Sequence, residues 1–148
     1  MSTTTFSNLK TASSSKMAIT GAIAGLVGGV FFGLMMGMTG MLPMVGMLVR
    51  QENALVGFVV HMVISAFIGA VYGLVAGRFA LTWTNAVIGG IVNGVVWWLL
   101  GALTLMPLFL GMTQMVFVIG QAQWMSLVGH LIYGVITALV FIPLRKRM

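Results

Sequence analysis

Residues 17–41 read MAITGAIAGLVGGVFFGLMMGMTGM and contain no charged side chain. Glycine recurs at every fourth position of this stretch, from Gly21 to Gly37. About 20 helical residues cross the hydrocarbon core of a bilayer, and residues four apart share one helix face. The stretch therefore predicts a membrane-spanning helix with a flat glycine stripe along one side.

The composition of the whole chain agrees with a membrane protein. Of its 148 residues, 60% are hydrophobic and 5% are charged, whereas about a quarter of a soluble domain is charged. This excludes a soluble enzyme, a disordered tail and a secreted disulfide scaffold. There is no cysteine, and Glu52 is the single carboxylate side chain, which excludes thiol chemistry and two-carboxylate catalysis within one chain. We expect no catalytic residues and a protein that is not an enzyme.

Three further apolar runs are long enough to cross a bilayer, at about 54–77, 84–106 and 117–142. Lipid offers no hydrogen-bond partner to a free backbone group, so these runs must be helices. The expected fold is an all-α integral membrane four-helix bundle over residues 17–148. The Ser- and Thr-rich residues 1–16 are expected to form a flexible cytoplasmic tail. Pro43 and Pro107 are expected to follow the ends of the first and third spans.

The basic residues predict the orientation of the chain. With four spans, one side of the membrane carries six of them and the other carries Arg50 alone. The six are Lys10, Lys16, Arg78, Arg145, Lys146 and Arg147. Positive charge collects on the cytoplasmic side, so we expect cytoplasmic N and C termini in the inner membrane. The basic residues flank apolar runs and form no continuous face, so no nucleic-acid partner is expected.

The two halves of the sequence resemble each other. One alignment of the halves matches Gly25 with Gly89 and Pro43 with Pro107, and a second, longer shift matches His61 with His130. The difference between the two shifts is interpreted as an insertion in the second outer loop. Each half would be an up–down helical hairpin, so the sequence predicts two parallel repeats about a pseudo-two-fold axis along the membrane normal.

Small residues recur every four positions in the later spans as well, in the manner of a glycine zipper. Such stripes let two backbones approach closely when lipid removes the hydrophobic drive between helices. The expected packing residues are Gly25, Gly29, Gly33, Gly37, Gly69, Gly73, Gly77 and Gly134. A pore-lining or sliding glycine face is the alternative.

His61 and His130 are the ionisable side chains expected inside the membrane, each on the small-residue stripe of its helix. One reading is a neutral imidazole bonded to Ser65, Asn93, Tyr133 or a backbone carbonyl, which would connect helices. A second reading is a ligand pair for a b-type haem or a metal. A third is a pH-sensing or proton-passing role.

Methionine is abundant, with 14 residues, and clusters around the outer end of the first span. Thioethers are soft ligands that select Cu(I), so Met38, Met41 and Met44 together with both histidines form a candidate copper site. The alternative is that these methionines are flexible apolar filler.

At GLMMGMTGMLPM (33–44), at His61 with its following glycines, and at GHLIYG (129–134), the chain resembles a family of small four-span prokaryotic membrane proteins of unassigned function. The resemblance covers most of residues 20–142 and implies four spans, with the MLPM and histidine segments as family features. It implies no reaction and no ligand. A looser similarity is to accessory subunits of respiratory or photosynthetic complexes.

The sequence thus favours a non-enzymatic membrane scaffold or accessory subunit, present as a homo-oligomer or within a larger membrane complex. Two alternatives stay open. One is a copper transporter or carrier that uses the methionine cluster and both histidines, and the other is a haem-binding electron-transfer subunit.

Overall fold

The computed structural model describes residues 3–79 and 82–147, in which helices dominate and no strand occurs. Four helical segments are long and apolar enough to cross a membrane: Ser14–Met38, Ala54–Ala76, Trp83–Phe109 and Gln121–Lys146. The elements in chain order are α1 (Thr3–Met38), α2 (Leu42–Gly46), the 3-10 turn η1 (Met47–Val49), α3 (Ala54–Ala76), α4 (Trp83–Trp97), the π-helix η2 (Trp98–Leu105), α5 (Met106–Phe109), the 3-10 turn η3 (Thr113–Met115) and α6 (Gln121–Lys146). The prediction of an all-helical chain with four helices long and apolar enough to span a membrane is confirmed.

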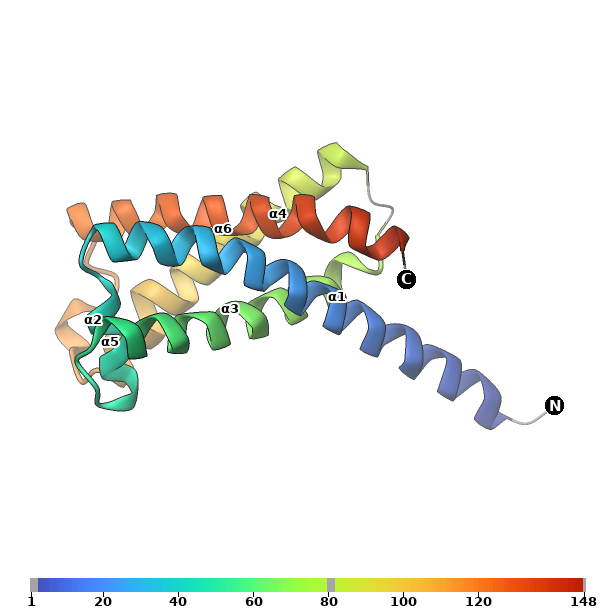
Figure 1. Cartoon of the computed structure of the whole chain (residues 1–148), viewed down its shortest axis with the longest axis horizontal. Coiled ribbons are helices and arrows are strands. Elements are labelled where there is room, and N and C mark those ends of the chain that lie inside the picture. The colour runs from blue at the N-terminus through green and yellow to red at the C-terminus, as the bar shows by residue number, and fades with distance from the viewer. Residues whose placement is uncertain (1–2, 80–81, 148) are drawn as a thin grey trace.

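Helix α1 is longer than its membrane-spanning part. It begins at Thr3 and has 36 residues, so it is about 54 Å long. The segment expected as a flexible tail is therefore helical from Thr3, because a helix that already exists extends at little cost. This first part of α1 projects beyond the other helices (Figure 1).

The first and last spans differ from the predicted boundaries by a few residues. Helix α1 ends at Met38, because Gly40 takes a left-handed conformation at φ 71° and the chain turns into α2. Helix α6 begins at Gln121 instead of residue 117, since Phe117 is also left-handed at φ 57°. The Gln123 side chain accepts a hydrogen bond from the Gly120 amide at 3.0 Å, which fixes the new start.

Pro107 does not end the third span, contrary to the sequence prediction. The helix continues through the π-helix η2 into α5 and ends at Phe109. Proline has no amide hydrogen, so residue 107 cannot donate to the Leu103 carbonyl as it would in an α-helix. The Phe117 amide donates to that carbonyl instead, at 3.0 Å. The distal loop, defined as residues 110–120, thus folds back against η2.

The long helices pack in the order α3, α1, α6, α4 (Figure 1). Helix α1 lies between α3 and α6, and α4 packs mainly on α6, whereas α3 and α4 barely touch. The start of α1, the α3–α4 turn and the end of α6 lie at one end of the bundle, called the terminal end below. The short helices α2 and α5 lie at the opposite, distal end.

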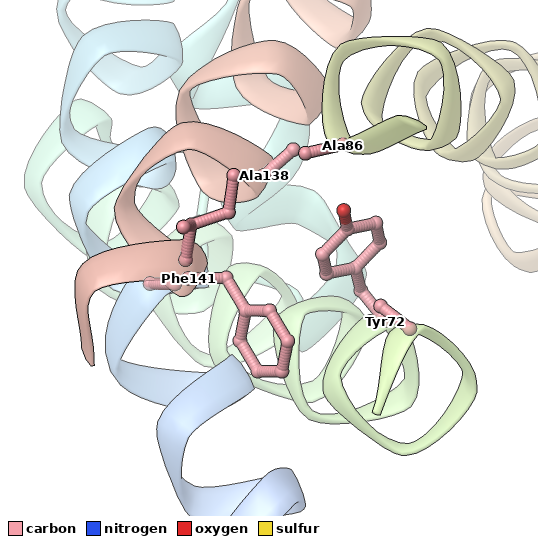
Figure 2. Packing of buried hydrophobic residues seen from close by; sticks show 7 residues of the cluster. Tyr72, Ala86, Ala138 and Phe141 are labelled. Atoms are coloured by element: carbon pink, nitrogen blue, oxygen red, sulfur yellow. The ribbon is translucent and has the colours of Figure 1, made fainter. Parts of the chain in front are cut away.

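Two buried clusters fill the bundle. The cluster in Figure 2 draws on all four long helices and places the Tyr72 ring edge-on to Phe141, with ring centroids 5.6 Å apart. Ala86 and Ala138 complete it where α4 meets α6. The second cluster joins α1, α2, α3 and α6 and contains Phe32 and Tyr133. Small residues occupy the closest approaches and aromatic rings fill the wider gaps.

The two hairpins make their closest contacts in matching positions. Gly25 of α1 lies against Gly69 of α3, and Gly90 of α4 lies against Gly134 of α6. The same shift in residue number carries Gly25 onto Gly90 and Gly69 onto Gly134. One alignment of the hairpins, called the glycine register below, therefore relates both contacts, in place of the two different shifts predicted from the sequence.

The glycine register does not bring the two histidines into equivalent places. In it, His61 corresponds to Ser126, and Ser65 corresponds to His130. Each histidine therefore aligns with a serine in the other hairpin. The two histidines are displaced from each other by four residues, about one helical turn. The duplication itself stays a prediction.

Candidate functional site

The crossing of α1 and α3 is built from glycine. A Cβ added to Gly25 would lie 2.7 Å from the Gly69 Cα, and one added to Gly21 would lie 2.8 Å from the Gly73 Cα. Carbon atoms do not approach so closely, so no larger residue fits without moving a helix. The two backbones therefore touch along this stripe, as small residues permit in lipid.

The other predicted packing glycines have different surroundings. An added Cβ would lie 2.6 Å from the Ser65 Cβ at Gly29, 2.6 Å from the Phe58 ring at Gly33, and 3.2 Å from the Met17 Cβ at Gly77. Gly37 lies outside the crossing, because its added Cβ would meet only the Leu42 Cδ1 atom at 3.6 Å.

Two glycines outside the predicted packing set bring α6 against α1. A Cβ on Gly28 would lie 2.7 Å from the Tyr133 carbonyl oxygen. A Cβ on Gly129 would lie 2.7 Å from the Met35 Cε atom and even closer to the Phe32 ring. The adjacent pair Gly28 and Gly29 could have indicated this contact from the sequence. Neighbouring residues point about 100° apart on a helix, so the two glycines can face two different helices.

His61 of α3 connects its helix to α1. Its Nε2 atom lies 2.9 Å from the Gly29 carbonyl oxygen, and the side chain is 7% exposed. A carbonyl only accepts, so Nε2 carries the ring proton and donates it. The Ser65 hydroxyl oxygen lies 3.3 Å from the same nitrogen. The imidazole is thus oriented by the backbone of the neighbouring helix.

His130 of α6 bonds within its own helix. Its Nδ1 atom lies 2.8 Å from the Ser126 carbonyl oxygen, so Nδ1 carries the proton by the same reasoning. The Ser126 hydroxyl lies 3.4 Å from this nitrogen. Gly94 of α4 packs against the backbone of residues 130 and 131. A Cβ added to Gly94 would lie 2.9 Å from the His130 carbonyl carbon.

Phe32 of α1 contacts both imidazoles. Its ring centroid lies 5.2 Å from that of His61 and 4.8 Å from that of His130, in edge-on arrangements. A bis-histidine haem or a shared metal ion needs both rings to present a nitrogen to one central atom. Here each ring directs one nitrogen at a backbone carbonyl and packs against the same phenyl group. The second nitrogen of each ring makes none of the described hydrogen bonds, so the haem and metal readings stay predictions.

The methionines of the candidate copper site lie in different environments. Met38 is 82% exposed and Met44 is 46% exposed, so both lie on the outside of the bundle. Met41 is partly buried and packs against the second cluster. Across the described ranges, no group of three or more His, Cys, Asp or Glu side chains is placed to hold a metal ion.

The three polar residues expected between helices behave differently. The Tyr133 hydroxyl of α6 reaches past α1 and donates to the Ser65 backbone carbonyl of α3 at 2.7 Å. This bond connects α6 to α3, and the Tyr133 hydroxyl oxygen lies 2.9 Å from the position that a Cβ on Gly25 of α1 would occupy. The buried Nδ2 atom of Asn93 has no partner in the described part of the chain.

Two surface depressions lie away from the histidines. One lies between α1 and α3 and is lined by apolar side chains only, among them Leu26, Phe58 and Met62. Another lies at the distal end between Arg50, Glu52 and Phe109. The site defined by Gly29, Phe32, His61, Ser65, His130 and Tyr133, called the histidine cluster below, is therefore a packed contact between helices.

In comparisons with protein-family models, curated proteins and solved structures, the chain shows no match.

Proposed function

We propose that the protein is a non-enzymatic integral membrane scaffold or accessory subunit. One observation carries the proposal: in the histidine cluster, both imidazoles and the tyrosine hydroxyl bond to backbone carbonyls, two of them across helices. Polar groups used in this way stabilise one arrangement of helices. These groups line neither of the two surface depressions described above.

The scaffold works by presenting a rigid unit to other membrane components. The glycine stripes are occupied within the chain, so a partner binds on other faces. Exposed apolar side chains cover those faces, for example Val63 and Phe67 on α3 and Phe117 in the distal loop. The partner is a second copy of the chain or a larger membrane complex, in the inner membrane with both termini cytoplasmic.

Purification from native membranes in a mild detergent tests this function. The protein is expected to migrate in native gels well above the size of one chain and to carry the same partner in independent preparations. Replacing Phe67 and Phe117 by Ala should release that partner and leave the helical content unchanged. Replacing Ile19, which is similarly exposed at 56%, is the control.

One experimental result would show that the protein is a copper carrier and not a scaffold. If the purified protein migrates as one chain and moves Cu(I) across the membrane of reconstituted vesicles, it is a transporter. Replacing His61 by Ala should then abolish transport, whereas a scaffold would show no transport in any variant.

A further inference from the structure

The terminal end of the bundle gathers positive charge from three parts of the chain. Lys16 precedes the apolar part of α1, Arg78 follows α3, and the sequence Arg145–Lys146–Arg147 ends α6. The side chains of Lys16, Arg78, Lys146 and Arg147 are exposed. The protein has no carboxylate side chain here, because Glu52 is its only one and lies at the distal end.

Contacts around Gly77 bring these segments together. A Cβ on Gly77 would lie 3.2 Å from the Met17 Cβ. Lys16 and Arg78 are the chain neighbours of these two residues, so both lie at the same helix crossing. The Arg145 guanidinium donates from its two terminal nitrogens to the Gly77 and Phe79 carbonyls, each at 3.1 Å. The end of α6 is therefore attached to the α3–α4 turn.

The charge at the two ends of the bundle differs in kind. At the distal end, Arg50 and Glu52 line one depression, so that end is electrically balanced. At the terminal end, like charges are held close together with no acidic side chain among them. Such a cluster is stabilised by external anions. It lies where the apolar spans end. Trp83, the first residue of α4, is 56% exposed and suited to the membrane interface.

We propose that this basic end binds the phosphate groups of anionic phospholipids. Arg78, Lys146 and Arg147 carry the contact, while Arg145 is a positioning residue that fixes the end of α6 beside the turn. Each basic side chain near an anionic membrane surface strengthens binding by about fivefold. The protein therefore selects anionic over zwitterionic lipid at this end alone.

Native mass spectrometry of the full chain with added lipid tests the proposal. The wild-type protein is expected to retain phosphatidylglycerol more strongly than phosphatidylcholine. The double variant Arg78→Gln, Arg147→Gln should lose about tenfold or more of that preference. Both side chains are exposed, so the fold is expected to stay intact, and circular dichroism of the variant checks this.

Arg50→Gln is the control, because it removes one positive charge at the distal end. It should leave the preference unchanged, and added inorganic phosphate should not displace the bound lipid. The proposal is overturned if the wild-type chain retains both lipids equally, if Arg50→Gln lowers the preference as much as the double variant, or if inorganic phosphate displaces the lipid.

Discussion

At the scale of single residues, the two histidines look alike in sequence and differ in structure. His61 donates to the backbone of α1, whereas His130 donates to the backbone of its own helix. The sequence predicted that both histidines lie on small-residue stripes. A backbone carbonyl was one of the hydrogen-bond partners considered for them. The His61 partner was not predictable, because it depends on how far α3 is shifted along α1. His130 instead bonds the carbonyl four residues before it in α6.

This difference predicts unequal effects of replacement. His61→Ala removes a hydrogen bond between helices and should lower the free energy of unfolding by about 1 kcal/mol. His130→Ala removes a bond within one helix and should lower it by less, since both variants lose a similar contact with Phe32. Unfolding in a mixed detergent by circular dichroism measures both. Equal losses would contradict the assignment of the two bonds.

Tyr133 offers a sharper comparison, because Tyr72 is a matched control. Tyr133→Phe deletes the hydroxyl that donates to the Ser65 carbonyl and should destabilise the bundle by about 1 kcal/mol. Tyr72 is also buried, and its hydroxyl makes none of the described hydrogen bonds, so Tyr72→Phe should have little effect. The same unfolding measurement applies. A larger effect at Tyr72 would exclude the proposed role of Tyr133.

At the scale of helices, backbone contact through glycine sets the order of the bundle. The α1–α6 contact depends on Gly28 and Gly129. In the glycine register their counterparts are Asn93 on α4 and Ile64 on α3. Between α3 and α4, the Phe67 ring instead lies edge-on to the Trp97 ring, with centroids 6.0 Å apart.

Two glycines of α1 should respond to alanine in opposite directions. Gly25→Ala forces the new methyl group against the Gly69 backbone and should destabilise the protein by about 1–3 kcal/mol. Gly37→Ala meets only the Leu42 side chain, at 3.6 Å. It should stabilise the helix by up to about 1 kcal/mol, because alanine favours helix more than glycine does. If unfolding measurements show that both changes destabilise alike, the glycine crossing is not where the structure places it.

The contact between the distal loop and the helix around Pro107 was not predicted from the sequence. The proline was expected to end a span, but a hydrogen bond from the Phe117 amide, further along the chain, compensates for its missing amide. A sequence pattern does not predict this hydrogen-bond partner, because the bond forms only when the loop folds back onto η2.

Pro107→Ala should weaken the attachment of the distal loop. The new amide can donate to the Leu103 carbonyl and compete with the Phe117 amide for it. Hydrogen exchange at Phe117 should accelerate, while the amides in the middle of α3 exchange as before. Unchanged protection at Phe117 would show that its bond to Leu103 does not hold the loop.

At the scale of the whole molecule, hydropathy alone was enough to predict four helices, because lipid permits few other structures. The glycine spacing also predicted which faces of α1 and α3 meet. The sequence could not give the order α3, α1, α6, α4, since exposed apolar faces look the same whether they meet lipid or protein. Nor did it identify the glycine register, because matches between apolar segments do not show which backbones touch.

The direct contact of α1 and α3 along their glycine stripes is the central claim, and disulfide cross-linking tests it best because the chain has no cysteine of its own. Met17→Cys with Gly77→Cys places two thiols where the Cβ separation is 3.2 Å, close to disulfide geometry. This pair should oxidise rapidly in membranes. Ile19→Cys with Gly77→Cys is the control, since Ile19 is 56% exposed on the same helix. Rapid cross-linking of the Met17 pair alone is the predicted result; equal cross-linking of both pairs, or of neither, would contradict the account.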